Sequence, residues 1–125
     1  MSRKNHHKRD SCYYCERGFT FKNFGKGNAV IKTVDHIIPE SKGGIDKYIN
    51  TVFSCKYCNS LKSNLTLDQF IAKIEELIAK NDSPALFPKI SYHKILEKTH
   101  QLKKYVERQR EKLYKSPSPG IDKIP

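Results

Sequence analysis

The sequence has no apolar run near the roughly 18 to 20 residues that a membrane-spanning helix requires, and this absence excludes a helical membrane protein. Residues 1–10 are basic and polar, and no apolar stretch follows them as it does in a secretory signal. We therefore expect an intracellular, cytoplasmic protein in a reducing compartment. Acidic side chains are also scarce, because 13 Asp and Glu stand against 24 Lys and Arg and leave a net charge of +11. This excess favours a polyanionic partner.

The length of 125 residues favours a single hydrophobic core over two independent domains. The positive charge is uneven along the chain, with a net charge of +6 on residues 1–34, +1 on residues 35–65 and +4 on residues 66–125. A nearly neutral centre between basic flanks is expected if the flanks bind phosphate while the centre holds a more specific site. A solvated, lysine-rich surface accounts for the same charges equally well.

The second half of the chain carries the clearest helical signals. Thr66 followed by Gln69 fits a capping box, and apolar residues then recur at steps of three and four, which predicts a helix over residues 67–80. Prolines interrupt the pattern within residues 81–89, and a second apolar stripe predicts a longer helix over residues 91–115. The two helices should pack together as a hairpin.

The first half of the chain favours short strands. Residues 19–34 mix β-forming side chains with a glycine-containing turn, which predicts a hairpin. A short strand ending near His36 precedes a loop over residues 37–46 that contains proline and two glycines. Residues 50–54 form the next predicted strand.

All four cysteines lie in two C-x-x-C pairs, Cys12 with Cys15 and Cys55 with Cys58. Two intervening residues let both sulfurs of a pair bind one ion, and four thiolates at about 2.3 Å form the closed tetrahedral shell of structural zinc. A redox C-x-x-C does not need a second copy, and two disulfides disagree with a reducing compartment. We therefore predict a structural zinc ion that supplies much of the folding free energy of this small domain.

Further motifs follow one another within and after the cysteine bracket. The segment TVDHIIP contains the pair Asp35-His36, the segment SKGG follows it, Asn50 lies downstream, and CKYCNSLK closes the series. This order resembles the zinc-knuckle branch of the HNH endonuclease family over residues 12–65. The resemblance implies an α+β fold with a small, treble-clef-like ββα-metal core, here followed by the helical hairpin. It also implies metal-dependent cutting of nucleic acid, usually DNA.

The resemblance assigns a role to each matching residue. His36 is similar to the general base that activates water, and Asp35 is similar to a ligand of the catalytic cation. Asn50 matches the position that steadies the loop and orients the histidine. Asn59 matches the position of the second protein ligand, and Lys62 matches a lysine that faces phosphate.

The chemistry of these side chains agrees with the assigned roles. A histidine that titrates near neutrality can accept a proton from water, and a hard cation can stabilise charge on the phosphate. The chain carries Asn59 where many family members have a third histidine, so its ligands are oxygens and favour Mg²⁺ or Mn²⁺. Asp35 and His36 are neighbours, which face opposite sides of a regular strand, so they can serve one site only if the strand is irregular or ends there.

Basic residues outside the motifs are candidates for binding the DNA backbone. The predicted helix over residues 91–115 is basic in its second half, and we expect Lys103, Lys104 and Arg108 to contact phosphate. Lys42 in the glycine loop is equally compatible with a phosphate contact and with a solvated charge.

The predicted function is therefore a metal-dependent endonuclease that nicks or cuts DNA, with RNA a weaker candidate substrate. A noncatalytic zinc-knuckle module that binds nucleic acid or protein is the alternative, and an interaction subunit that docks through its two C-terminal helices is the third. The sequence leaves the target site, the biological role and the oligomeric state open. We divide the chain into four parts: a flexible basic arm (1–11), the nuclease core (12–65), a helical extension of the same domain (66–115) and a disordered tail (116–125).

Overall fold

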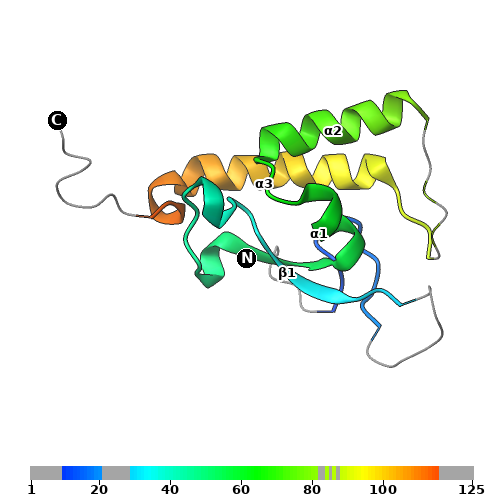
Figure 1. Ribbon diagram of the computed structural model, residues 1–125, viewed down its shortest axis with the longest axis horizontal. Helices are drawn as coiled ribbons and strands as arrows, with labels where there is room; N and C mark the ends of the chain where they lie inside the picture. The colour runs from blue at the N-terminus through cyan, green and yellow to red at the C-terminus, as the bar shows by residue number, and fades with distance from the viewer. Residues whose placement is uncertain (1–9, 21–28, 82–83, 85, 87, 116–125) are drawn as a thin grey trace.

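The computed structural model describes residues 10–20, 29–81, 84, 86 and 88–115. In chain order the elements are β1 (Lys32–His36), the 3₁₀ turns η2 (Glu40–Lys42) and η3 (Tyr48–Asn50), β2 (Thr51–Cys55), α1 (Lys56–Lys62), α2 (Leu67–Ala79) and α3 (Tyr92–Leu113). The predicted α+β class is confirmed, because a two-stranded sheet and one short helix precede a pair of longer helices (Figure 1). Within the described residues, no helix combines the length and apolar character needed to cross a membrane.

The sheet brings the Asp35-His36 pair to the end of a strand. β1 and β2 are antiparallel, with Asp35 opposite Val52 and His36 opposite Thr51. Asp35 and Val52 are buried, whereas Val34 on the other face is 52% exposed. β1 ends at His36, and Pro39 and the turn η2 follow. β1 therefore ends at the Asp35-His36 pair, which is one of the two conditions under which these neighbouring side chains can serve one site.

Helix α1 begins directly at the second cysteine pair. Cys55 is the last residue of β2 and also caps α1, because its Sγ accepts a hydrogen bond from the Cys58 amide at 3.4 Å. The helix ends at Lys62, and the next residue, Ser63, has a left-handed φ of 51°. Asn59 and Lys62 are therefore three residues apart on one short helix, as predicted.

The two longer helices form where the apolar periodicity predicts them. α2 begins with the predicted capping box, in which Thr66 and Gln69 bond reciprocally, and it ends one residue before the predicted position. Ser91 caps α3 by accepting a hydrogen bond from the Lys94 amide. α3 stops at Leu113, two residues before the predicted end, and Gln109 has non-helical φ and ψ angles within it. The helices pack side by side (Figure 1), which confirms the predicted hairpin.

One hydrophobic cluster joins the cysteine knuckles to the helical pair. The Tyr14 and Phe70 rings meet edge to face with their centroids 5.6 Å apart, and Ile74, Ile95 and Leu102 belong to the same buried cluster. At the base of the predicted 19–34 hairpin, the Thr20 amide donates to the Val30 carbonyl at 2.9 Å. Three predictions concern residues outside the described ones. These are the turn of that hairpin, most of the N-terminal arm and the tail over 116–125.

Candidate functional site

The four cysteines form one buried cluster, as their spacing predicts. The sulfur atoms of Cys12, Cys15, Cys55 and Cys58 all lie within 4.8 Å of one another, and all four residues are buried. The Cys15 and Cys55 sulfurs are 3.8 Å apart. A regular tetrahedron with metal–sulfur bonds of about 2.3 Å has edges of about 3.8 Å, so the cluster fits the dimensions of a zinc site.

Backbone amides also point at the sulfurs. The Cys15 amide donates to Cys12 Sγ at 3.5 Å, and the Cys58 amide donates to Cys55 Sγ at 3.4 Å. Each C-x-x-C pair therefore turns its own backbone toward its first sulfur. Such bonds stabilise the thiolate form, which is the form that binds a metal.

A second site lies at the end of β1, where a cleft of about 360 Å³ opens to the surface. The cleft brings together three of the predicted site residues, Asp35, His36 and Asn59, from β1 and α1. The loop after β1 and the end of α1 complete its wall, which is lined by Val34, Asp35, His36, Pro39, Glu40, Ser41, Asn59, Ser63 and Asn64.

The His36 ring is held by a carboxylate. Its Nε2 lies 2.8 Å from Asp46 Oδ1 and 3.9 Å from Glu40 Oε1, and a quarter of its side chain is exposed. An ionised carboxylate only accepts hydrogen bonds, so we assign the ring proton to Nε2. The other ring nitrogen, Nδ1, then carries the lone pair that can accept a proton.

The Asp35 carboxylate is buried and bonded at both oxygens. Tyr14 donates its hydroxyl to Oδ2 at 2.7 Å, and the Lys62 ammonium lies 3.3 Å from Oδ1. Burial raises the pKa of Asp35, and the Lys62 charge opposes that shift. Burial also raises the pKa of Tyr14 well above its usual value, which keeps the hydroxyl protonated as a donor. Asp35 is thus an internally partnered carboxylate at the inner wall of the cleft.

Lys62 lies in a different place from the one that the family resemblance implies. Its side chain is fully buried, and its ammonium donates to the His36 carbonyl at 2.8 Å as well as to Asp35. Burial lowers the pKa of Lys62, and the Asp35 charge opposes that shift. The Lys62 ammonium therefore does not face a surface where phosphate could bind. It donates its hydrogen bonds to Asp35 and His36 at the end of β1 instead.

Asn50 is buried beside the loop that follows β1. Its Oδ1 accepts from the Ile38 amide at 3.0 Å, and its Nδ2 donates to the Ile38 carbonyl at 3.0 Å and to the Ile45 carbonyl at 2.8 Å. Three bonds therefore fix the loop that follows His36. These contacts suit a residue that steadies the loop, although Asn50 does not touch the His36 ring in any of them.

Asn59 presents its side chain to the cleft from α1. Its Nδ2 donates to Thr33 Oγ1 at 2.9 Å and makes a longer contact of 3.4 Å with the Val34 carbonyl. The Val34 contact identifies the nitrogen, because a carbonyl cannot donate. The amide oxygen of Asn59 has no hydrogen-bond partner among the residues that the structure describes.

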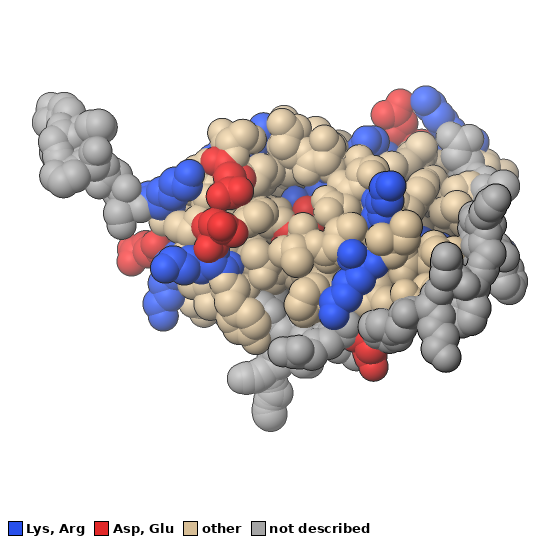
Figure 2. Space-filling model, turned by 60° about the horizontal axis from the view of Figure 1, so that its bottom comes forward, with Lys and Arg blue, Asp and Glu red and all other residues tan. Residues whose placement is uncertain are grey.

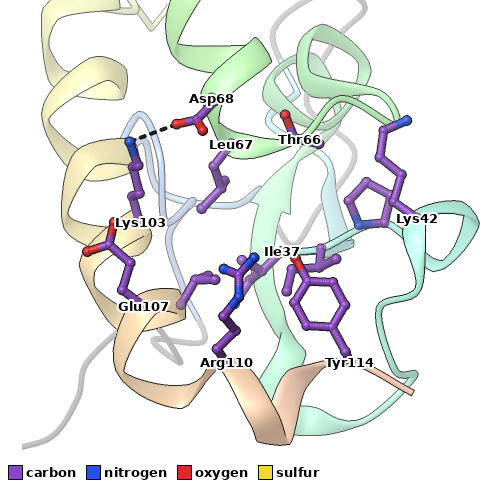
Figure 3. A pocket seen from close by; sticks show the side chains of 12 residues that line it. Ile37, Lys42, Thr66, Leu67, Asp68, Lys103, Glu107, Arg110 and Tyr114 are labelled. Carbon is purple, nitrogen blue, oxygen red and sulfur yellow. Dashed lines mark ion pairs between the residues drawn. The ribbon is translucent and has the colours of Figure 1, made fainter. Parts of the chain in front are cut away.

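The predicted phosphate contacts fall in two groups. Lys42 and Lys103, which are far apart in the sequence, line the same groove of about 340 Å³ together with Arg110 (Figure 3). Lys103 is ion-paired in that groove with Asp68 at 2.8 Å. Lys104 and Arg108 are exposed on α3 and lie outside the groove lining.

Two contacts at the cleft were not predicted from the sequence. Asp46 lies in the loop before η3, and only the folded loop brings its carboxylate to His36. Tyr14 stands inside the first C-x-x-C pair, where its aromatic ring suggests packing around the metal. The ring does pack on Phe70, but its hydroxyl also reaches Asp35. No periodicity or motif in the sequence marks either contact.

The comparisons with known proteins agree with this geometry. The family model described as HNH endonuclease matches residues 12–65, which span β1, β2, α1 and both cysteine pairs. The comparisons with curated proteins and with solved structures give no match. The matched residues hold the four-cysteine cluster and the cleft with His36. Residues 12–65 of this chain are therefore similar to the HNH endonuclease family, and this segment includes the four-cysteine cluster.

Proposed function

We propose that the protein is an endonuclease that hydrolyses DNA phosphodiester bonds with the help of a single divalent cation. The observation that carries the proposal is the convergence of Asp35, His36 and Asn59 on one open cleft at the end of β1. The match of residues 12–65 to the HNH endonuclease family model supports nuclease chemistry in general. In the proposed reaction a water oxygen bonds to phosphorus while the bond from phosphorus to the 3′ oxygen breaks.

His36 is the proposed general base. The attacking water must lose a proton, and Nδ1 of His36 is the unprotonated ring nitrogen when Nε2 donates to Asp46. Asp46 then holds the ring in one tautomer and stabilises the positive charge that the ring gains with the proton. Asn50 supports the same step indirectly, because its three bonds to the 38–45 loop fix the chain that carries Asp46.

Asp35 and Asn59 would hold the cation. A carboxylate and an amide oxygen are ligands that suit Mg²⁺ or Mn²⁺. The Asn59 oxygen has no partner among the described residues, and each Asp35 oxygen accepts one bond and retains a further lone pair. When bound, the cation supplies positive charge that stabilises the negative charge developing on the phosphate. The Lys62 ammonium helps to fix the Asp35 carboxylate through its contact with Oδ1.

The charge of the chain supports DNA as the substrate. The net charge is +11, and the groove with Lys42, Lys103 and Arg110 adjoins the cleft, because Pro39 lines both. A strand cut in the cleft could therefore continue its backbone along basic side chains of α3. Acidic residues in the groove, Asp68 and Glu107, limit how much phosphate it can attract.

Conversion of supercoiled plasmid tests the proposal. Zinc-loaded protein is incubated with plasmid in Mg²⁺, in Mn²⁺ and in EDTA, and the nicked and linear forms are measured. Cutting with either ion and its loss in EDTA are expected, with recovery when the ion is added back. Absence of cutting with both ions, by protein shown to be folded and to bind DNA, contradicts the proposal.

A noncatalytic zinc-knuckle module is the second candidate, and one observation favours it. Both oxygens of Asp35 are already bonded inside the protein, to Tyr14 and Lys62, and the residue is only 3% exposed. A carboxylate that serves as a structural counter-ion leaves the cleft with fewer groups for a cation. Under this reading the protein binds DNA in a salt-dependent way, does not cut plasmid, and is unaffected in binding by replacement of His36.

A further inference from the structure

Arg17, a residue outside all of the sequence motifs, reaches the cysteine cluster. Its Nε donates to Cys15 Sγ and its Nη2 donates to Cys55 Sγ, both at 3.2 Å. One guanidinium group thus bonds a sulfur from each C-x-x-C pair. Its third nitrogen, Nη1, donates to the Pro88 carbonyl at 3.2 Å, in the connection between α2 and α3.

The local backbone explains how Arg17 returns to the cluster. Glu16 has a left-handed φ of 65°, and its amide donates to the Cys12 carbonyl at 2.9 Å. The Cys12 amide in turn donates to the Arg17 carbonyl at 2.9 Å. The chain therefore folds back on itself directly after Cys15, and this turn directs the Arg17 side chain over the sulfurs rather than into solvent.

We propose that Arg17 is a positioning residue of the zinc centre, which clamps the two cysteine pairs together and slows the release of the metal. Four thiolates around Zn²⁺ carry a net charge of about −2, and a guanidinium beside them offsets part of that charge. Arginine suits this place because its planar fork can bond two acceptors at once, whereas the lysine ammonium acts as a point charge. The half-buried position of Arg17 limits screening by salt.

The proposal concerns the metal and not the cutting reaction, so its test does not use nuclease activity. Zinc release from the full-length, zinc-loaded protein is followed with a chromogenic chelator for the wild type, Arg17→Gln, Arg17→Lys and Arg110→Gln. Arg110→Gln is the matched control, because it removes the same charge from an exposed residue of α3 whose guanidinium lies over the Tyr114 ring. Each protein is also loaded with Co²⁺, whose thiolate charge-transfer bands report directly on the sulfurs.

Replacement of a group that bonds metal ligands typically costs 10- to 100-fold in metal affinity, so Arg17→Gln should release zinc roughly 10 to 100 times faster. Arg17→Lys should lie between Arg17→Gln and the wild type, and Arg110→Gln should match the wild type. The difference should persist at raised salt. The Co²⁺ charge-transfer bands of Arg17→Gln should move to longer wavelength, because a thiolate without the hydrogen bonds is easier to oxidise.

Several results would overturn the proposal. Wild-type release from Arg17→Gln contradicts it, as does equal acceleration in Arg110→Gln, which would indicate a general charge effect. If Arg17→Gln does not fold, Arg17→Lys provides the test. Zinc release from Arg17→Lys at the wild-type rate, with unshifted Co²⁺ bands, would then contradict the proposed role of Arg17. Wild-type protein that folds without bound metal would show that the cysteine cluster is not a zinc centre, and this result would also overturn the proposal. Absence of plasmid cutting would contradict the proposed nuclease function but not the role of Arg17.

Discussion

At the scale of single residues, Lys62 is unusual because its side chain is fully buried, and lysine is rarely buried unless it is paired. Its partner is Asp35, which is also buried and which receives a further bond from Tyr14. A buried ion pair is weak evidence for added stability, but the loss of one partner leaves a buried charge uncompensated. Lys62 is the last residue of α1. The structure at the end of β1, where Asp35 and His36 lie, therefore depends on this one side chain of α1.

This dependence predicts a large effect for Lys62→Met. The variant leaves the Asp35 carboxylate buried with only Tyr14 as partner, and it should lower the free energy of unfolding by about 3 to 5 kcal/mol. Urea unfolding of the zinc-loaded protein measures the change, with Lys56→Met on the same helix as the control because Lys56 is exposed. The double variant Asp35→Asn, Lys62→Met should recover part of the loss. Equal urea midpoints for Lys62→Met and Lys56→Met contradict the interpretation.

A second prediction at this scale separates the proposed base from a proposed cation ligand. His36→Ala should stay folded, keep its zinc and bind DNA, while its cutting rate falls by about 10² to 10⁴. Asn59→Ala should also cut slowly, but raised Mn²⁺ should restore part of its rate, since the defect lies in binding the ion. Plasmid nicking rates over a Mn²⁺ series measure both variants, and His93→Ala is the control because His93 is an exposed histidine of α3.

Rescue of Asn59→Ala but not of His36→Ala by raised Mn²⁺ would distinguish a cation ligand from a general base. Asp35→Ala is a less specific test, because it also removes the counter-ion of Lys62. Wild-type nicking by His36→Ala, in a preparation purified twice to remove contaminating nuclease, would refute the assignment of the base. Equal rescue of both variants by Mn²⁺ would show that His36 acts on the ion rather than on water.

At the scale of elements, local signals in the sequence predict the helices well. Thr66 and Gln69 form a capping box within four residues of chain, and the apolar stripe that follows defines the packed face of α2. The cysteine spacing likewise predicts the cluster, because each pair is a local unit. The contacts of Asp46 and Lys62 could not be predicted in this way, since they join residues 10 and 27 positions apart and depend on how the loop and α1 meet β1.

The loop after β1 packs closely around Gly44. Gly44 lies so close to its neighbours that an added Cβ would stand 1.9 Å from the Ile38 carbonyl oxygen and 2.8 Å from Asn50 Nδ2. These are the groups through which Asn50 fixes the loop. Only glycine therefore allows Asn50 to hold both sides of the loop that contains Asp46.

This packing predicts that Gly44→Ala damages the loop. The Ile38 backbone must move to accept a methyl group, so we expect a loss of about 1 to 3 kcal/mol in the free energy of unfolding and slower plasmid cutting. Gly18→Ala is the matched control, because the nearest atom to its Cβ, the Asp10 carbonyl oxygen, is 3.9 Å away. Thermal unfolding and nicking rates measure both variants. If Gly44→Ala unfolds and cuts like Gly18→Ala, the loop is looser than the contacts imply.

At the scale of the whole molecule, contacts of the two C-x-x-C segments connect residues 12–65 to the helical pair. Tyr13 donates its hydroxyl to the Lys98 carbonyl at 3.0 Å, and the Tyr57 and Tyr92 hydroxyls are 2.8 Å apart. Glu16 forms ion pairs with two lysines of α3, Lys94 and Lys98. The first turns of α3 are thus fixed to the half of the molecule that contains the four cysteines, and the second half of α3 lines the groove.

Side chains of both charge signs lie on the face of the molecule shown in Figure 2. Several Asp and Glu side chains lie beside Lys and Arg side chains toward one end of this face, and separate Lys and Arg side chains lie across the rest of it. Lys103 illustrates the mixture, because its ammonium is already paired with Asp68. Lys104 and Arg108 are exposed on the same helix, so they are better placed than Lys103 to exchange water for phosphate.

This arrangement predicts how charge reversal on α3 changes DNA binding. Each phosphate contact contributes about 0.9 to the slope of log affinity against log salt, so the variant Lys104→Glu, Arg108→Glu should bind all sequences more weakly and show a slope lower by about 2. Lys103→Glu alone should change the slope less, because Lys103 must first leave Asp68. Lys80→Glu, at the C-terminal end of α2, is the control for a change of net charge. Affinities over a salt series measure the slopes, and a double variant with the wild-type slope would assign this face of α3 to a protein partner instead.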